Sequence, residues 1–278
     1  DFLFVGAFHM AEVGVAVATA AAQLSTFVII GLWLLKIKFP FPFSKKNFKI
    51  DFGSVKSIFK VSLPLWLQEL LVSVSFMIIA ALVNSMGVVA SASVGIIAKV
   101  FNLGGIFPLA IGNAIAAMAA QNLGAGRRDR ALKALGWGVA YSLIIDVAFC
   151  IYCQIAPETI TAAFATQEPV IAGAAAYLRS FSIDLVFVAL IFCTNAYLNG
   201  CGKSLVTMIH SLAATFGLRV PLSIVFAGLT GLTLNTQLYY LGFAAPIASV
   251  LSIVICLAYI YRQEKAHRKL SVPSEEGV

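Results

Sequence analysis

The side chains that could do chemistry in this sequence are acids and amides inside long apolar segments. Glu69 follows Gln68 in SLPLWLQELLVS, and Asp184 lies in YLRSFSIDLVFVALIFCTNAY. A charge inside a membrane costs about 2.5–3.5 kcal/mol on insertion scales, so each acid needs a partner, a water-filled cavity or a neutral form. We therefore expect Glu69 and Asp184 to bind a proton or a cation. The alternatives are that Glu69 pairs with a basic residue near the membrane surface and that Asp184 pairs with Arg179.

Amide and aromatic side chains share the expected helical face of Asp184. Asn195 follows it after about three helical turns, which returns the side chain to the same face. With Phe187 these residues form a stripe of polar and aromatic groups, and such a lining suits an organic cation. We expect Gln68, Asn84, Phe187 and Asn195 to line a binding cavity, and ordinary helix packing is the alternative for each.

Three further charged residues lie inside apolar segments. Asp146 is expected to form a structural ion pair with Lys99 or with another helix, and a role in ion coupling is the alternative. Arg219 precedes Val220 and Pro221. Because a proline leaves a backbone carbonyl without its hydrogen bond, we expect the guanidinium group of Arg219 to bond carbonyls there.

No catalytic or cofactor-binding motif withstands inspection. The GKS at 202–204 lacks the preceding glycine of a phosphate-binding loop, because that position is Tyr197. The CIYC at 150–153 lies in an apolar segment, so packing explains it better than redox chemistry. His9, His210 and His267 are too scattered for a metal site. We expect neither an enzyme nor a protein with a cofactor, metal ion or disulfide framework.

The composition requires a membrane environment for these residues. Hydrophobic residues make up 60% of the 278 residues, charged residues only 11%, and the mean hydropathy is +0.95. Soluble domains are about 45–50% apolar and about 25% charged. This contrast excludes a soluble enzyme, a disordered protein and a nucleic-acid-binding domain. It predicts an all-α, polytopic transmembrane bundle whose immediate partner is the lipid bilayer, with no nucleic acid bound.

Seven apolar segments are long enough to cross a bilayer, since a helical span needs about 20 residues. Prolines at 64, 108, 221 and 246 lie inside them, and each removes a backbone hydrogen bond. The expected helices are 11–35, 58–86, 89–121, 131–155, 169–198, 204–229 and 238–261.

The basic residues indicate how the chain is oriented. Of the 19 lysines and arginines, 16 lie at 36–60, 127–133, 203 or 262–269, which are alternate connections, and the other three are Lys99, Arg179 and Arg219. Cytoplasmic connections carry the excess of lysine and arginine, so the N-terminus of this chain is expected outside and the C-terminus in the cytoplasm. The net charge of +7 is thus a signal of membrane topology.

Several motifs in the right order resemble the multidrug and toxic compound extrusion (MATE) family. They are SLPLWLQELLVSVSFMIIAALVNSMG at 62–87, NLGAGR at 122–127, AYLNGCGKS at 196–204 and LRVPLS at 218–223. The resemblance extends over residues 58–262. In that family, twelve helices form two six-helix lobes joined by a cytoplasmic linker.

The resemblance implies an architecture and an activity. Residues 1–35 would be the last helix of the N-terminal lobe, 36–57 the cytoplasmic linker, 58–262 the six-helix C-terminal lobe and 263–278 a cytoplasmic tail. The remaining N-terminal lobe of the same polypeptide would be a partner, and the chain, which begins with Asp1, is expected to be a partial one. Family members in the plasma membrane exchange a proton or sodium ion for small organic cations. Glu69 and Asp184 are the acids on the helices that carry such sites in several members.

Two other functions stay open at this point. A flippase of lipid-linked saccharides has a related architecture, but its cavity should carry several basic residues. A seven-helix receptor would also have its N-terminus outside, although residues 238–261 contain no lysine for a retinal Schiff base.

Overall fold

The computed structural model describes residues 11–37 and 51–271, and the chain divides into two compact units, Asp1–Phe52 and Gly53–Val278. In the first unit, the main described element is helix α1 (Ala11–Lys36), whose large apolar side chains are mostly exposed. Most of the expected linker and the end of the expected tail lie outside the described residues.

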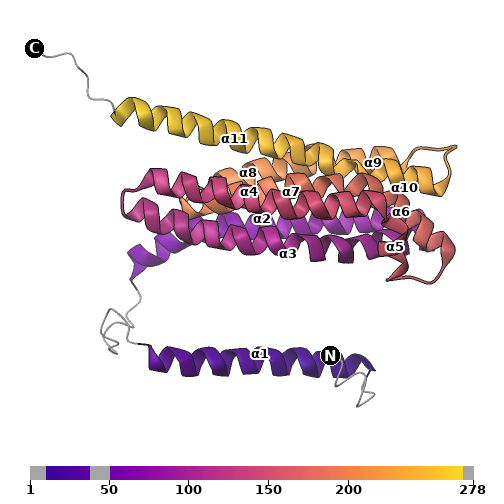
Figure 1. Ribbon diagram of the computed structural model, residues 1–278, viewed down its shortest axis with the longest axis horizontal. Helices are drawn as coiled ribbons and strands as arrows, with labels where there is room; N and C mark the ends of the chain where they lie inside the picture. Colours follow the sequence, from indigo (N-terminus) through magenta and orange to yellow (C-terminus); the bar gives the residue numbers. More distant parts are fainter. Residues whose placement is uncertain (1–10, 38–50, 272–278) are drawn as a thin grey trace, which may run out of the picture. The chain divides into compact units, whose positions relative to one another are not determined.

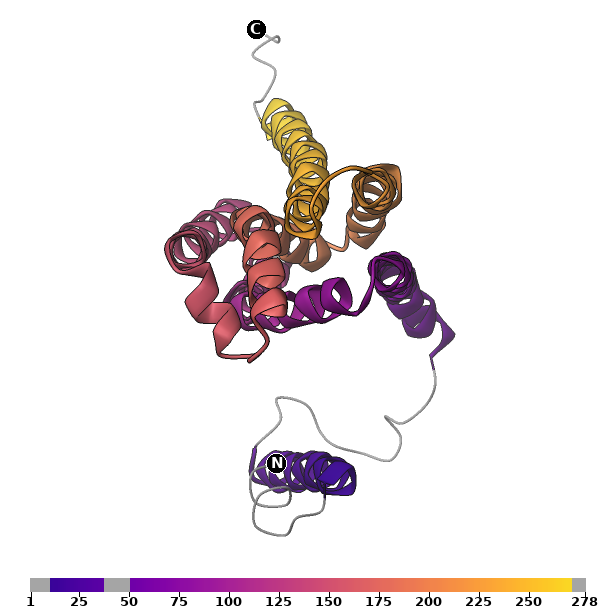
Figure 2. The ribbon, with the colours of Figure 1, turned by 90° about the vertical axis from the view of Figure 1, so that its right-hand side faces the viewer.

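The second unit is a bundle of helices that run side by side, and its described residues contain no strand (Figure 1). Figure 2 shows the same helices nearly end-on. Seven helical segments in the described part of the chain are long and apolar enough to cross a membrane, which confirms the predicted class. In the second unit the elements are α2 (Phe52–Ser85), α3 (Val88–Gly124), α4 (Arg128–Ile155), α5 (Pro157–Ala162), α6 (Glu168–Phe181), α7 (Ile183–Gly200), α8 (Ser204–Ala214), the π-helix η3 (Thr215–Arg219), α9 (Val220–Ala227), α10 (Leu234–Gly242) and α11 (Ala244–Ser271).

Three of the expected continuous helices are interrupted. The segment expected at 169–198 is divided into α6 and α7 at Ser182. A side chain from α4 accounts for this break, because Gln154 Nε2 donates to the Arg179 carbonyl at 2.5 Å and to Ser182 Oγ at 2.9 Å. A polar side chain inserted at the helical hydrogen-bond ladder is a recognised cause of such a break.

Prolines explain the other two interruptions. Pro221 has no N–H group to donate to the carbonyl of the preceding helical turn. Immediately before it the chain forms the π-helix η3, in which the Val220 N–H donates to the Thr215 carbonyl. Pro246 likewise leaves the carbonyl of Gly242 without a helical donor, and α10 ends at Gly242. The sequence located both prolines but did not specify the geometry of either break. Helix α2 also begins earlier than expected, at Phe52.

Close packing holds α7 between its neighbours. Leu185 of α7 belongs to one buried hydrophobic cluster, while Cys193 and Tyr197 belong to a second. A Cβ atom on Gly200 would lie 2.5 Å from the Ala116 carbonyl oxygen, so α7 and α3 meet at a residue that must be small. This packing fixes the face of α7 that carries Asp184 and Asn195.

Candidate functional site

A cavity of about 1130 Å³ lies inside the second unit and is lined from α2, α3, α6, α7, α8, η3 and α11. Its lining combines apolar surface with acids, amides, aromatic rings and one guanidinium group. The polar and aromatic lining residues include Gln68, Glu69, Phe76, Asn84, Asn102, Asn113, Tyr177, Asp184, Phe192, Asn195, Asn199 and Arg219. Such a mixture is typical of sites for small organic molecules.

Asp184 is the buried acid of this cavity. Its side chain lies in the first turn of α7, is only 4% exposed and has one carboxyl oxygen, Oδ1, without a hydrogen-bond partner. Ser249 and Arg219 are the polar neighbours that act on the carboxyl group. A buried acceptor with spare capacity that faces a cavity is suited to binding a proton or a cation.

Glu69 and Gln68 of α2 add a second carboxyl group and an amide group to the cavity lining. Both line the cavity, Glu69 is exposed, and the buried Oε1 of Gln68 has no hydrogen-bond partner. Among the described residues, no ion pair involves Glu69. The expectation that these two residues face a cavity therefore agrees with their positions, while their role stays a prediction.

Arg219 differs from its expected role. It is the last residue of η3 and lines the cavity, and its Cζ atom lies 4.4 Å from the centroid of the Phe76 ring. A guanidinium group over an aromatic face is a favourable cation–π contact. The prediction that Arg219 bonds carbonyls freed by Pro221 is therefore wrong, because the helix accommodates the proline by a π turn and leaves the guanidinium group on the cavity wall.

The amide oxygen of Asn195 is hydrogen-bonded to a buried histidine, a contact that the sequence pattern did not reveal. The Nε2 atom of His210 lies 2.8 Å from Asn195 Oδ1, and its Nδ1 atom lies 2.8 Å from Ser252 Oγ. The sulfur of Cys256 lies 3.0 Å from the same Nε2 atom. His210 is fully buried, so this network joins α7, α8 and α11 directly behind the cavity. The sequence signal was one polar residue in each of three apolar helices, which pointed to no common location.

Of the two remaining residues predicted to line the cavity, one does and the other does not. Asn84 lines the cavity and accepts a hydrogen bond of 2.5 Å from Ser91 Oγ. Phe187 is not among the lining residues, so its assignment to the cavity is wrong; Phe192 supplies the aromatic ring of α7 instead. The lining positions of α7 are 184, 188, 191, 192, 195, 196 and 199, which is a regular helical stripe from which position 187 is rotated away.

Asp146 is buried outside this cavity. Its side chain is 0% exposed, and neither carboxyl oxygen has a hydrogen-bond partner. The predicted ion pair with Lys99 is absent from the described residues. One turn earlier on α4, Ser142 Oγ lies 3.3 Å from Cys193 Sγ of α7, which places Asp146 at the α4–α7 packing interface.

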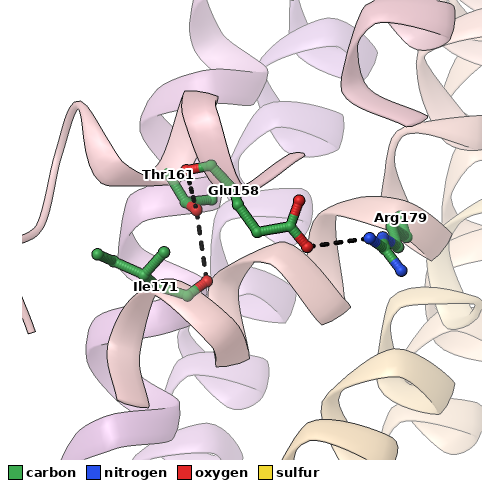
Figure 3. Close-up of polar contacts among 4 residues, drawn as sticks. All are labelled: Glu158, Thr161, Ile171 and Arg179. Atoms are coloured by element: carbon green, nitrogen blue, oxygen red, sulfur yellow. Dashed lines mark hydrogen bonds and ion pairs between the residues drawn. The ribbon is translucent and has the colours of Figure 1, made fainter. Parts of the chain in front are cut away.

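Arg179 also has a different partner from the one considered. Its Nη2 atom lies 2.9 Å from Oε1 of Glu158 on α5, and both side chains are exposed (Figure 3). The Thr161 hydroxyl donates to the Ile171 carbonyl at 3.3 Å, which ties α5 to α6 in the same view. Asp184 is therefore left without Arg179 and faces the cavity.

The lining of the cavity is suited to binding a small molecule or ion. The described residues contain no group of three histidine, cysteine, aspartate or glutamate side chains that could hold a metal ion. The cavity offers two carboxyl groups, several amides and aromatic faces, with Arg219 as a basic group among the described lining residues.

Comparisons with known proteins agree with this architecture. The chain is 24% identical over 267 residues to the probable multidrug resistance protein YoeA of Bacillus subtilis, covering 94% of this chain and 56% of that protein. It is 24% identical over 222 residues to the probable multidrug resistance protein NorM of Thermotoga maritima, covering 79% and 48% respectively. The chain thus spans about half the length of the curated relatives that it matches.

Solved structures show the same fold. A structure described as "Crystal structure of MATE in complex with MaL6" matches with a TM-score of 0.83 and 18% identity, covering 95% of this chain and 60% of that one. A structure from Pyrococcus furiosus, whose description reports a reversed polarity of the binding pocket in a MOP superfamily transporter, matches with a TM-score of 0.83 and 18% identity, covering 94% and 59%. The sequence profile of the MatE family matches residues 64–225, which is more than half of the chain. The chain therefore belongs to the MatE family.

Proposed function

We propose that this chain forms part of a secondary antiporter that exports organic cations across the cell membrane in exchange for protons or sodium ions. Family membership and the names of the curated relatives support transport, and multidrug efflux in particular. A second six-helix lobe of the same polypeptide would face the cavity from the other side. The distribution of lysine and arginine supports a cytoplasmic C-terminus.

The observation that carries the proposal is the position of Asp184. A carboxyl group that is 4% exposed, has a free oxygen and lies on the wall of a large cavity binds one positive charge far better than two. Proton or sodium ion and organic cation would therefore exclude one another there. Mutually exclusive binding at one group is the requirement for exchange of the two species.

Arg219 would act as a third, internal competitor. Its guanidinium group influences the Asp184 carboxyl and lies over Phe76. When the bound cation leaves, Arg219 would partly compensate the negative charge, so the empty site would be less costly in a low-dielectric environment. A substrate with an aromatic ring would compete with Arg219 for the Phe76 face as well.

The alternative of a flippase for lipid-linked saccharides has less support. Such a cavity should carry several basic groups, whereas Arg219 is the one basic residue among the described lining residues and Glu69 and Asp184 oppose it. Family membership also removes the support for a seven-helix receptor.

The test uses the complete polypeptide that contains this sequence, reconstituted in vesicles with an imposed pH or sodium gradient. Asp184→Asn should abolish gradient-driven export of ethidium, and Glu69→Gln should reduce it. Glu158→Gln makes the same acid-to-amide change outside the cavity and should leave export intact. If both cavity variants export the dye at the rate of the parent protein, the proposed site is refuted.

A further inference from the structure

A second concavity lies on the outside of the bundle, between α3 and α4. It has a volume of about 390 Å³ and belongs entirely to the second unit. Helix α3 contributes residues 111, 114, 115 and 118, and α4 contributes residues 130, 133, 134, 137, 138 and 141. Both sets follow the three-and-four spacing of a single helix face, so the concavity is a groove along two adjacent helices. We call it the α3–α4 groove.

The groove faces away from the central cavity. The residues of α3 that line the cavity include 109, 112, 113 and 116, whereas those that line the groove are 111, 114, 115 and 118. Each set recurs at helical spacing, and the two sets occupy different faces of the same helix. A ligand in the groove would therefore be separate from the transported molecule.

The side chains at the floor of the groove are small, and those that form its walls are large. A Cβ atom on Gly138 would collide with the Ile115 side chain, so α3 and α4 approach each other closely there. Met118, Trp137 and Tyr141 border this floor and are 48%, 66% and 59% exposed. The Trp137 and Tyr141 rings lie 6.1 Å apart, centroid to centroid, and are inclined at 30°. These large exposed side chains give the groove apolar walls.

One end of the groove is positively charged. Arg130 and Lys133 line it near the turn between α3 and α4, and both are exposed. Neither takes part in an ion pair among the described residues, unlike the neighbouring Arg128, which binds Glu264 at 2.7 Å. No acid lines the described groove. Its charged end is therefore free to receive an anion.

We propose that the α3–α4 groove binds one anionic phospholipid, with its phosphate on Arg130 and Lys133 and an acyl chain along the apolar floor. Basic pockets between membrane helices on the cytoplasmic side are suited to anionic head groups. From Arg130 to Tyr141 the helix extends about 16 Å at 1.5 Å per residue, and half of a hydrocarbon core of about 30 Å is about 15 Å. The groove thus matches one lipid leaflet in length and in charge.

Trp137 provides a direct readout of the bound lipid. The chain has three tryptophans, so replacing Trp33 and Trp66 with phenylalanine leaves Trp137 as the single fluorophore. This variant of the full chain is reconstituted into phosphatidylcholine vesicles, and brominated phosphatidylglycerol or brominated phosphatidylcholine is titrated in. Each basic residue near an anionic surface contributes roughly fivefold in affinity, so phosphatidylglycerol should quench Trp137 with ~10–30-fold preference.

Matched charge variants test where the preference arises. Arg130→Gln with Lys133→Gln should bring the phosphatidylglycerol preference close to that of phosphatidylcholine. Arg262→Gln with Lys265→Gln removes the same residue types at the same spacing from an exposed part of α11 and should leave the preference intact. Equal quenching by the two lipids in the parent chain would overturn the proposal, as would a preference that survives in the groove variant. If the groove variant fails to fold, the comparison of the two lipids in the parent chain decides the matter.

Discussion

The carboxyl group of Asp146 allows a test in which removing an acid should stabilise the chain. Both of its oxygens are buried and lack hydrogen-bond partners. One turn later on α4, Phe149 lies close to Leu185 of α7 next to Gly104, so the surroundings are apolar. Burying a polar group without a hydrogen bond costs about 1–3 kcal/mol in proteins. Leucine at this position would remove that cost and add apolar burial.

The expected gain for Asp146→Leu is about 1–3 kcal/mol of unfolding free energy, because the added apolar burial is partly offset by overpacking against α7. Asp146→Asn keeps the shape of the side chain but still buries unpaired polar atoms, so it should give no such gain. The assay is unfolding of the chain in dodecyl maltoside micelles titrated with SDS and followed by far-ultraviolet circular dichroism.

The opposite result would refute the reasoning. If Asp146→Leu and Asp146→Asn both unfold at a lower SDS fraction than the parent, the carboxyl group has a polar partner or an ion in solution. Asp146 would then be a binding group in its own right rather than an unpaired acid at a packing interface.

Three further predictions follow from the packing and from the charge distribution. His210→Phe should lower stability by about 2–4 kcal/mol in the same SDS titration, because it leaves the buried Ser252 and the partly buried Asn195 without their partner, and His210→Gln should recover part of the loss. Gly200→Ala should destabilise by about 1–3 kcal/mol because its Cβ would meet a carbonyl of α3, whereas Gly136→Ala, which meets nothing within 4 Å in a helix, should stabilise by about 0.5–1 kcal/mol. A cysteine at Arg127 should react with a membrane-impermeant maleimide only in broken cells and one at Thr166 in intact cells; labelling of both from outside would contradict the predicted orientation.

The sequence predicted the membrane-spanning class and most of the cavity because both depend on hydrophobic patterning. Apolar runs long enough for a bilayer are visible in any window, and a polar residue in such a run must face something other than lipid. Glu69, Gln68, Asn84, Asp184 and Asn195 line the cavity for that reason.

What the sequence did not reveal depends on contacts between distant helices. The break at Ser182 arises from a glutamine on α4, and the histidine behind Asn195 comes from α8. The error at Phe187 has a different origin. Asp184 and Asn195 mark the polar ends of the α7 stripe but leave its width open. The packing of Gly200 against α3 sets the rotation of the helix and turns Phe192 toward the cavity.

The π-helix before Pro221 has a mechanical consequence for the wall it belongs to. It holds one residue more per turn than the helices around it, and one residue corresponds to about 100° of rotation about the axis. An uninterrupted α-helix continuing from α8 would therefore carry Arg219 about 100° around the axis, away from its position over Phe76. The π turn thus determines that a positive side chain borders the cavity at this point.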